Sequence, residues 1–268
     1  MANPEENYIE VNKNLWNKRT EIHISSDFYD VPKFVAGQSS LNSIELDLLG
    51  DVKGKSILHL QCHFGQDTLS LARMGALVTG VDFSETAIDA AGKLAQEMSL
   101  DAQFICCDIY DLPENLSGQF DIVFTSYGTI GWLPDLEKWS AVVAHYLKPN
   151  GLFIMADFHP VIWMFDNAFE KIQYRYFKSE AIIETSNGTY ANKDSEIIAE
   201  EISWNHSLDE ILSNLLDKGL SLKSFKEFDY SPYSCFKNMV EDEPQKFRFK
   251  HWQNKLPMIY SIKAKKAE

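Results

Sequence analysis

From Lys55 onward the chain alternates short apolar runs with segments of helical periodicity, and this alternation limits its fold more than any other feature. Five runs have the length and composition of buried strands: Ile57–Cys62, Leu77–Asp82, Gln103–Cys107, Phe120–Ser126 and Leu152–Ala156. Helical patterns lie between them, over Asp67–Met74, Ser84–Met98 and the apolar stripe from Leu136 to Leu147. Strands that alternate with helices pair in parallel and are covered on both faces. We therefore predict an α/β fold with a mostly parallel sheet between two layers of helices.

Local signals mark where several of these elements begin and end. Ser84 is placed to cap the helix that follows it, and Pro149 with Asn150-Gly151 is expected to stop the helix before it. Further on, Ser207 and Glu210 have capping-box spacing ahead of a leucine-rich stripe that ends at Gly219. Two closing strands are predicted after it, over Leu220–Asp229 and Met258–Ala264.

We expect one domain over residues 1–268, in four parts. Residues 1–50 form an N-terminal helical cap, with short helices around Trp16 and from Ser39 to Leu49, and residues 51–157 form the core. Residues 158–204 are an insertion over the carboxyl edge of the sheet, and residues 205–268 supply the closing helix and strands. Alternation in Ile172–Phe177 and Ala181–Thr185, with a turn at Asn187-Gly188, predicts a hairpin within the insertion.

Composition excludes several classes of partner. A net charge of −14 repels phosphate backbones, so we expect no nucleic acid. No run approaches the ~18 apolar residues that cross a bilayer, so we expect no membrane. The 4 cysteines show no disulfide spacing, which favours a reduced, cytoplasmic protein. The sequence leaves the oligomeric state open.

Polar and small side chains follow the strands at the edge where a parallel sheet binds ligands. Each has a use if the ligand is adenosine-like. Asp82 lies 17 residues beyond Gly65, close to the spacing of an acid that accepts from ribose hydroxyls. Phe83 could lie along the adenine face, Asp108 could accept from its amino group, and Ile109 could pack on its ring. Gly65 lets the turn backbone approach the ligand without a Cβ.

Plainer interpretations stay open beside these. Asp108 and Asp157 are equally well explained as helix caps or turn residues. His59, Cys62 and His63 are metal-capable, but no second Cys/His pair follows at a structural-zinc spacing, so we expect no metal. We interpret His59 as a hydrogen-bonded core histidine and Cys62 as a packed thiol, which leaves His63 to contact ligand.

The chain resembles the class I S-adenosylmethionine-dependent methyltransferases over about residues 55–160. "VTGVDFSETAI" is similar to their ribose-binding segment and "CCDIYDLP" to their adenine-side segment, while "FDIVFTSYGTIGWLPD" and "LKPNGLFIMADFHP" look like their fourth and fifth strands. The resemblance implies a Rossmann-like seven-stranded sheet with an antiparallel last strand. It also implies S-adenosylmethionine as cofactor, S-adenosylhomocysteine as product and a small-molecule methyl acceptor.

The first-strand motif departs from the family pattern of an acid followed by three alternate glycines. In "HLQCHFG", His59 stands at the acid position, Gln61 and His63 at the first two glycine positions, and Gly65 at the third. We therefore expect cofactor contacts from these three turn residues, and Gln61 or His63 could replace the missing acid. The expected cofactor-binding set is Gln61, His63, Gly65, Asp82, Phe83, Asp108, Ile109, Ser126 and Tyr127.

Methyl transfer from a sulfonium is an in-line displacement driven mainly by positioning, and a base is needed only for a protonated acceptor. The candidates for that base are His159 and Tyr127, with Trp163 and Phe165 placed to bury an apolar acceptor. The N-terminal stretch around Trp16, Phe28 and Tyr29 is expected to form a lid with residues 158–204 and exclude water.

Two other function classes compete with methyl transfer. One is a non-catalytic module that binds the nucleoside cofactor. The other is a nicotinamide-dependent oxidoreductase, which is disfavoured because Gln61 and His63 occupy the places where its phosphate turn needs glycine.

Overall fold

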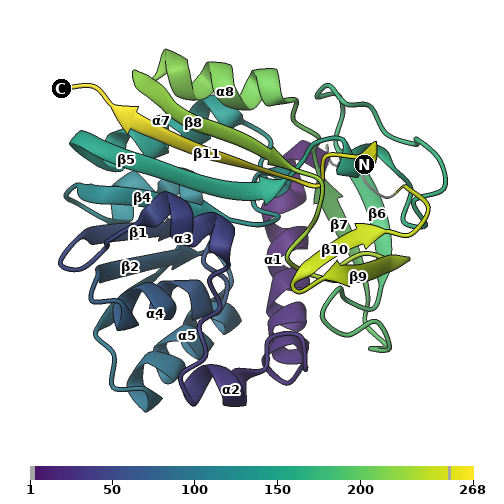
Figure 1. The fold of residues 1–268 in the computed structure, drawn as a ribbon, viewed down its shortest axis with the longest axis horizontal. Coiled ribbons are helices and arrows are strands. Elements are labelled where there is room, and N and C mark those ends of the chain that lie inside the picture. Colours follow the sequence, from purple (N-terminus) through teal and green to yellow (C-terminus); the bar gives the residue numbers. More distant parts are fainter. Residues whose placement is uncertain (1–3, 253–254) are drawn as a thin grey trace.

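The computed structural model describes residues 4–252 and 255–268. Its centre is a seven-stranded sheet in the order β3-β2-β1-β4-β5-β11-β8 (Figure 1). The strands are β1 (Ser56–Leu60), β2 (Leu77–Asp82), β3 (Ala102–Cys106), β4 (Phe120–Ser126), β5 (Leu147–Phe158), β8 (Leu220–Phe228) and β11 (Ile259–Lys266). β11 runs antiparallel to β5 and β8, whereas the pairs among β1 to β5 are parallel. The predicted α/β fold with an antiparallel last strand is confirmed.

Helices cover both faces of this sheet because successive strand side chains point to opposite faces. On β1, Leu58 and Leu60 pack with the face covered by α7 (Leu136–Tyr146) and α8 (Leu208–Asp217). Ile57 packs with the other face, which carries α3, α4 and α5. These are α3 (Ser43–Leu49), α4 (Gln66–Arg73) and α5 (Glu85–Glu97); the short α2 (Val31–Val35) and α6 (Leu112–Asn115) lie outside the main layers.

Two helix starts agree with the predicted caps. The Ser84 hydroxyl accepts from the Ala87 amide at 3.1 Å, and the Ser207 hydroxyl accepts from the Glu210 amide at 3.1 Å. Each bond satisfies an amide that has no partner in the first helical turn.

The N-terminal helix is longer than predicted. In place of a short helix around Trp16, α1 runs continuously over Pro4–Ile24. It lies between the central sheet and the hairpins on the far side of the molecule (Figure 1). Its buried side chains recur at helical spacing but are mostly polar: Asn12, Leu15, Arg19, Thr20 and His23. A search for apolar periodicity misses a stripe of this composition.

The insertion and the fifth strand also differ from the prediction. The predicted hairpin exists, but its strands are β6 (Ile182–Asn187) and β7 (Ile198–Ser203), so the expected strand over Ile172–Phe177 is wrong. β5 begins at Leu147, ahead of the predicted Leu152, because the chain passes through Asn150 in a left-handed conformation and continues as strand with a register shift against β4.

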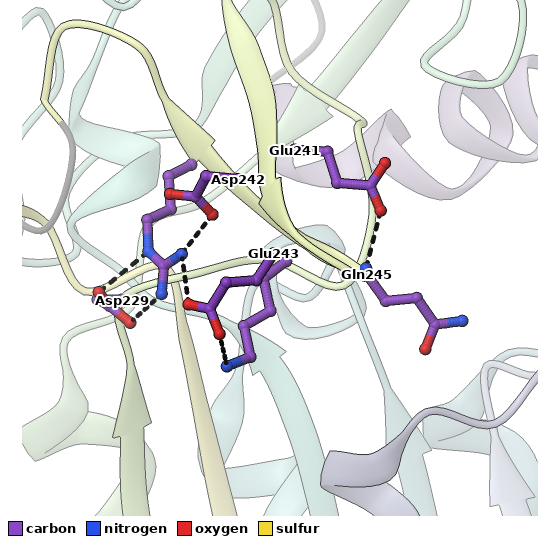
Figure 2. A network of polar contacts seen from close by, with 7 residues as sticks. Asp229, Glu241, Asp242, Glu243 and Gln245 are labelled. Atoms are coloured by element: carbon purple, nitrogen blue, oxygen red, sulfur yellow. Dashed lines mark hydrogen bonds and ion pairs between the residues drawn. The ribbon is translucent and has the colours of Figure 1, made fainter.

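A second hairpin precedes β11 and was not predicted. It pairs β9 (Met239–Glu243) with β10 (Lys246–Phe249). Figure 2 shows carboxylates that gather near the turn of this hairpin, where Arg248 donates to both oxygens of Asp229 at 3.0 and 3.1 Å and to Glu243 at 3.3 Å. Lys246 donates to the other oxygen of Glu243 at 2.7 Å. This ion-pair network ties the hairpin to the end of β8.

No helix within residues 4–252 and 255–268 combines the length and apolar character needed to cross a membrane.

Candidate functional site

A cavity of about 1030 Å³ opens at the carboxyl ends of β1, β2, β4 and β5. Most of the strand-end residues that the sequence singled out line it, namely Gln61, His63, Gly65, Asp82, Phe83, Ser126 and Tyr127. α1 and the β6–β7 hairpin supply part of its wall. Pockets for small ligands usually have volumes of roughly 300–1,000 Å³, so this cavity is at the upper end of that range. A narrow extension of about 30 Å³ lies between Asp82, Phe83, Asp108 and Ile109 on one side and Tyr8, Ile9 and Asn12 of α1 on the other.

In the turn between β1 and α4, three alternate residues adopt a backbone conformation that favours glycine, although only one of them is a glycine. Gln61, His63 and Gly65 have φ of 54°, 50° and 80°, all in the left-handed region. That region costs a residue with a β-carbon roughly 1–2 kcal/mol. At Gly65 a β-carbon would also lie 2.8 Å from the Phe104 ring, so glycine is required there. Strain of this kind persists where function or dense packing demands it.

This backbone conformation brings the turn onto Asp82. The buried Asp82 carboxylate accepts from the His63 amide at 2.8 Å and from the Ser84 amide at 2.9 Å. Burial raises the pKa of Asp82 to about 6, although these amides favour the charged form. Each oxygen accepts one bond here and can accept another, so the carboxylate is positioned to hold a diol.

His63 connects the turn to α1. One ring nitrogen of His63 lies 3.0 Å from a ring nitrogen of His23, so one imidazole donates to the other. Trp16 meets the His63 ring edge-on at 5.2 Å, and Tyr29 stacks on His23. Burial lowers the pKa of His23 to about 3. Burial, followed by repulsion from His23 and Arg19, holds the pKa of His63 well below its usual value. Both rings are therefore neutral near pH 7.

Gln61 bridges the ends of β1 and β4. Its amide nitrogen donates to the Thr129 carbonyl at 2.8 Å. Its amide oxygen is buried and has no partner among the described residues. Gln61 borders both the main cavity and its narrow extension.

His59 and Ser126 form polar contacts beneath the cavity. The His59 ring lies 2.8 Å from the Thr68 hydroxyl, and the Ser126 hydroxyl donates to Asp67 at 2.9 Å. Burial lowers the pKa of His59 to about 4. His59 is thus the hydrogen-bonded core histidine that the sequence indicated, and Cys62 is buried with a free thiol. No cluster of three or more His, Cys, Asp or Glu suited to a metal occurs in the part of the chain that the structure describes.

The two aspartates with open interpretations have different surroundings. Asp108 caps the 3₁₀ turn Ile109–Asp111 by accepting from the Tyr110 amide at 3.0 Å, yet it also borders the narrow extension. Asp157 is buried and accepts from the amides of Gly128, Phe158 and Thr129. Asp157 therefore fixes the loop after β4.

Tyr127 lines the cavity, but its hydroxyl donates to the buried Glu45 at 2.8 Å. Burial first, and then the charge of Glu45, raises the pKa of Tyr127 well above its usual value. A phenol held in its protonated form is not suited to act as a base near neutral pH.

His159 lies away from the cavity and does not join the other candidate residues. β5 continues to Phe158, so the chain leaves the sheet one residue later, and the His159 amide donates to the Met258 carbonyl at 2.9 Å. The ring lies 2.9 Å from Glu227 and accepts from the Val161 amide at 3.2 Å. The position at the cavity rim expected from the sequence is corrected: His159 does not line the cavity, and its two ring nitrogens contact Glu227 on β8 and the Val161 amide.

α1 contributes site residues that the sequence did not single out. Asn12 exchanges two hydrogen bonds with the Ile202 backbone on β7, at 2.8 and 3.0 Å. Arg19 forms an ion pair with Glu201 on β7, and Asn17 accepts from Ser84 at 2.7 Å. One helix thus joins the Asp82 side of the site to the hairpin. The helical spacing of the polar residues on α1 was the sequence feature that could have indicated this role.

Comparison with known proteins adds independent information. Residues 57–151 match a family model described as "Methyltransferase domain". An uncharacterized methyltransferase of Synechocystis sp. is 34% identical over 133 residues, which are 49% of this chain and 60% of that protein. Ubiquinone biosynthesis O-methyltransferase of Coxiella burnetii is 36% identical over 100 residues, 37% of this chain and 42% of that protein. The matches thus span only 60% and 42% of those two relatives.

Solved structures resemble the whole fold. An S-adenosylmethionine-dependent methyltransferase of Mesorhizobium loti aligns with a TM-score of 0.59 and 19% identity, covering 87% of this chain and 100% of that one. The agreement extends past the segment that the family model matches.

Proposed function

We propose that this chain, whose residues 57–151 match a model described as "Methyltransferase domain", transfers a methyl group from S-adenosylmethionine to a small-molecule acceptor. The observation that carries this proposal is the β1–α4 turn. Three left-handed residues there bring the His63 amide onto the buried Asp82 carboxylate, which keeps acceptor capacity for a ribose diol.

The residues present fit the cofactor in chemistry and position. Asp82 would accept from the ribose hydroxyls, and Phe83, Asp108 and Ile109 border the extension where the adenine would lie. The turn residues Gln61, His63 and Gly65 would face the amino-acid end, with Ser126 and Tyr127 nearby at the end of β4. The cofactor, when bound, supplies an activated methyl group.

The chain would accelerate the reaction by positioning. A bond forms from the acceptor atom to the methyl carbon as the carbon–sulfur bond breaks and the sulfonium becomes a thioether. Holding these atoms in line and excluding water contributes up to roughly 7–11 kcal/mol. Tyr127 is held protonated and His159 lies elsewhere, which favours an acceptor that needs no strong base or brings its own acidity.

A small-molecule acceptor is supported by the shape of the cavity and by one relative. Trp163 and Phe165 line the cavity beyond Tyr127 and provide an apolar wall for an acceptor. The Coxiella burnetii relative is named for ubiquinone biosynthesis, so a related protein acts on a small molecule. Exclusion of nucleic acid rests on the net charge of −14. A cytoplasmic location is part of the proposal and agrees with the free thiols of Cys62, Cys106, Cys107 and Cys235.

Water exclusion is assigned to a lid made of the N-terminal cap and residues 158–204. Asn12 and Arg19 attach α1 to β7, and both α1 and the hairpin border the cavity. The remaining parts of the proposed division, residues 51–157 and 205–268, supply the cofactor side and the closing strands.

Two measurements test the function. Calorimetry should detect S-adenosylhomocysteine binding and no NAD binding; the reverse would favour a nicotinamide-dependent oxidoreductase. Transfer of a labelled methyl group to a component of a small-metabolite extract should then occur. Binding without transfer to any extract would favour a non-catalytic nucleoside-binding module.

A further inference from the structure

Gln61 has a side chain that its backbone conformation disfavours. With φ at 54°, the position suits glycine, yet the chain places a glutamine there. His63 nearby has the same unfavourable left-handed backbone conformation, and its ring makes a compensating contact with His23. The contribution of the Gln61 side chain must therefore come from its own amide.

That amide is oriented by one partner. The Thr129 carbonyl can only accept, so the Gln61 end facing it at 2.8 Å is the NH₂ group. The carbonyl oxygen then points the other way. It is buried and lacks a donor among the described residues. A buried acceptor without a donor is unfavourable, so this oxygen is expected to gain one when the site is filled.

The position of Gln61 limits which group can donate to it. Asp82 and Asp108 line the narrow extension beside β2 and β3, where the nucleoside half of the proposed cofactor would lie. The amino-acid end must then extend toward β1 and β4, where Gln61 spans the two strand ends. This end carries an ammonium, which only donates, and a carboxylate, which only accepts. The carboxylates of Asp67 and Asp157 border the same cavity and favour a cation there.

We propose that the Gln61 side-chain oxygen accepts a hydrogen bond from the ammonium of the cofactor's amino-acid end. This inference rests on the proposed function and assigns Gln61 a selective binding role. It takes the place of the acid that the family pattern has at position 59, where this chain has the buried His59.

The test compares two ligands and one variant with the unsubstituted protein by calorimetry. S-adenosylhomocysteine carries the ammonium, whereas 5′-methylthioadenosine has the same nucleoside and sulfur without the amino-acid end. Gln61→Gly removes the amide while giving the backbone its preferred residue, so the variant should fold. We expect Gln61→Gly to weaken S-adenosylhomocysteine binding about tenfold to hundredfold and to leave methylthioadenosine within about twofold.

Other outcomes overturn the inference. If Gln61→Gly binds S-adenosylhomocysteine as well as the wild type does, the side chain is a filler. If both ligands weaken equally, the donor belongs to the nucleoside. Failure of the proposed function gives a different result. If the cofactor assignment is wrong, the unsubstituted protein binds neither ligand; if only methyl transfer is wrong, it binds S-adenosylhomocysteine but transfers no methyl group.

Discussion

Two buried arginines, one on the β9–β10 hairpin and one on α1, show how differently these two regions are built. Arg248 on β10 is surrounded by Asp229, Asp242 and Glu243, and its nitrogens all have partners (Figure 2). Arg19, on α1 beside the cavity, is equally buried, at 7% exposed for each residue. It has one carboxylate partner, Glu201, and its Nε has none within the described residues.

The difference extends beyond the two arginines. Around the β1–α4 turn and the inner face of α1, Gln61, His63 and His23 also have buried polar atoms that find no partner in residues 4–252 and 255–268. Unpartnered buried groups are unfavourable, so proteins keep them where binding or movement supplies the missing partner. The polar groups around Arg248 on the β9–β10 hairpin thus favour stability, whereas those around the cavity favour ligand binding. Substitutions should separate the two properties.

The largest effect is expected at the turn itself. Gly65→Ala adds a β-carbon at φ 80° and 2.8 Å from the Phe104 ring. We expect the free energy of unfolding to fall by about 3 kcal/mol and S-adenosylhomocysteine binding to be lost, since left-handed strain and overpacking add. Denaturant titration and calorimetry measure the two changes. Gly92→Ala in α5 is the control: it meets open space in a helix and should stabilise by about 0.5–1 kcal/mol. Equal stability of the two variants would contradict the required close approach at position 65.

On the β9–β10 hairpin, Arg248→Met should reduce the free energy of unfolding without reducing S-adenosylhomocysteine binding. It leaves Asp229, Asp242 and Glu243 without their shared cation, and we expect a loss of about 2 kcal/mol, less than for a fully buried pair because these carboxylates are partly exposed. Lys246→Met removes only an exposed pair and should lower the free energy of unfolding less than Arg248→Met does. Weaker S-adenosylhomocysteine binding by folded Arg248→Met would show that the two regions are coupled.

Arg19→Met should weaken S-adenosylhomocysteine binding more than it reduces the free energy of unfolding. Its loss removes the ion pair between α1 and Glu201 and loosens the cover over the main cavity, which both residues line. We expect about tenfold weaker S-adenosylhomocysteine binding, with a stability loss of about 1 kcal/mol. Lys13→Met, on the same helix, removes a more exposed pair with Glu85 and is the matched control. If Arg19→Met destabilises the protein more than it weakens binding, α1 is a structural helix and the lid proposal is wrong.

The same contrast explains what the sequence could and could not predict. The strands Leu77–Asp82 and Phe120–Ser126 were predicted at their observed bounds, because buried strands and the Ser84 cap depend on local composition. α1 was predicted too short, since its buried face carries Asn12, Arg19 and His23, whose partners are distant in sequence. His159 was placed at the cavity because no local signal shows that β5 continues to Phe158 beside β11. Residues that bind through long-range contacts are thus the ones that periodicity leaves undetermined.

The smallest effect is a pH dependence from Asp82. Its pKa is raised by burial to about 6, so the folded, ligand-free protein holds this proton more tightly than the unfolded chain does. The stability that Asp82 contributes is therefore complete at pH below its ordinary pKa and is lost as pH rises through about 6. Diol binding has the opposite sign, because it requires the carboxylate. We expect S-adenosylhomocysteine affinity to fall about twofold from pH 7 to 6 and about tenfold by pH 5.

Calorimetry across that range checks the prediction, and Asp82→Asn separates Asp82 from other titrating groups. The amide cannot ionise, so its weaker binding should be independent of pH between 5 and 7. His23 and His63 do not produce the same profile, because burial holds the pKa of each well below this range. A profile that persists in Asp82→Asn would assign the titration to Asp108, whose pKa burial also raises, and would place the main acceptor at the adenine end of the site.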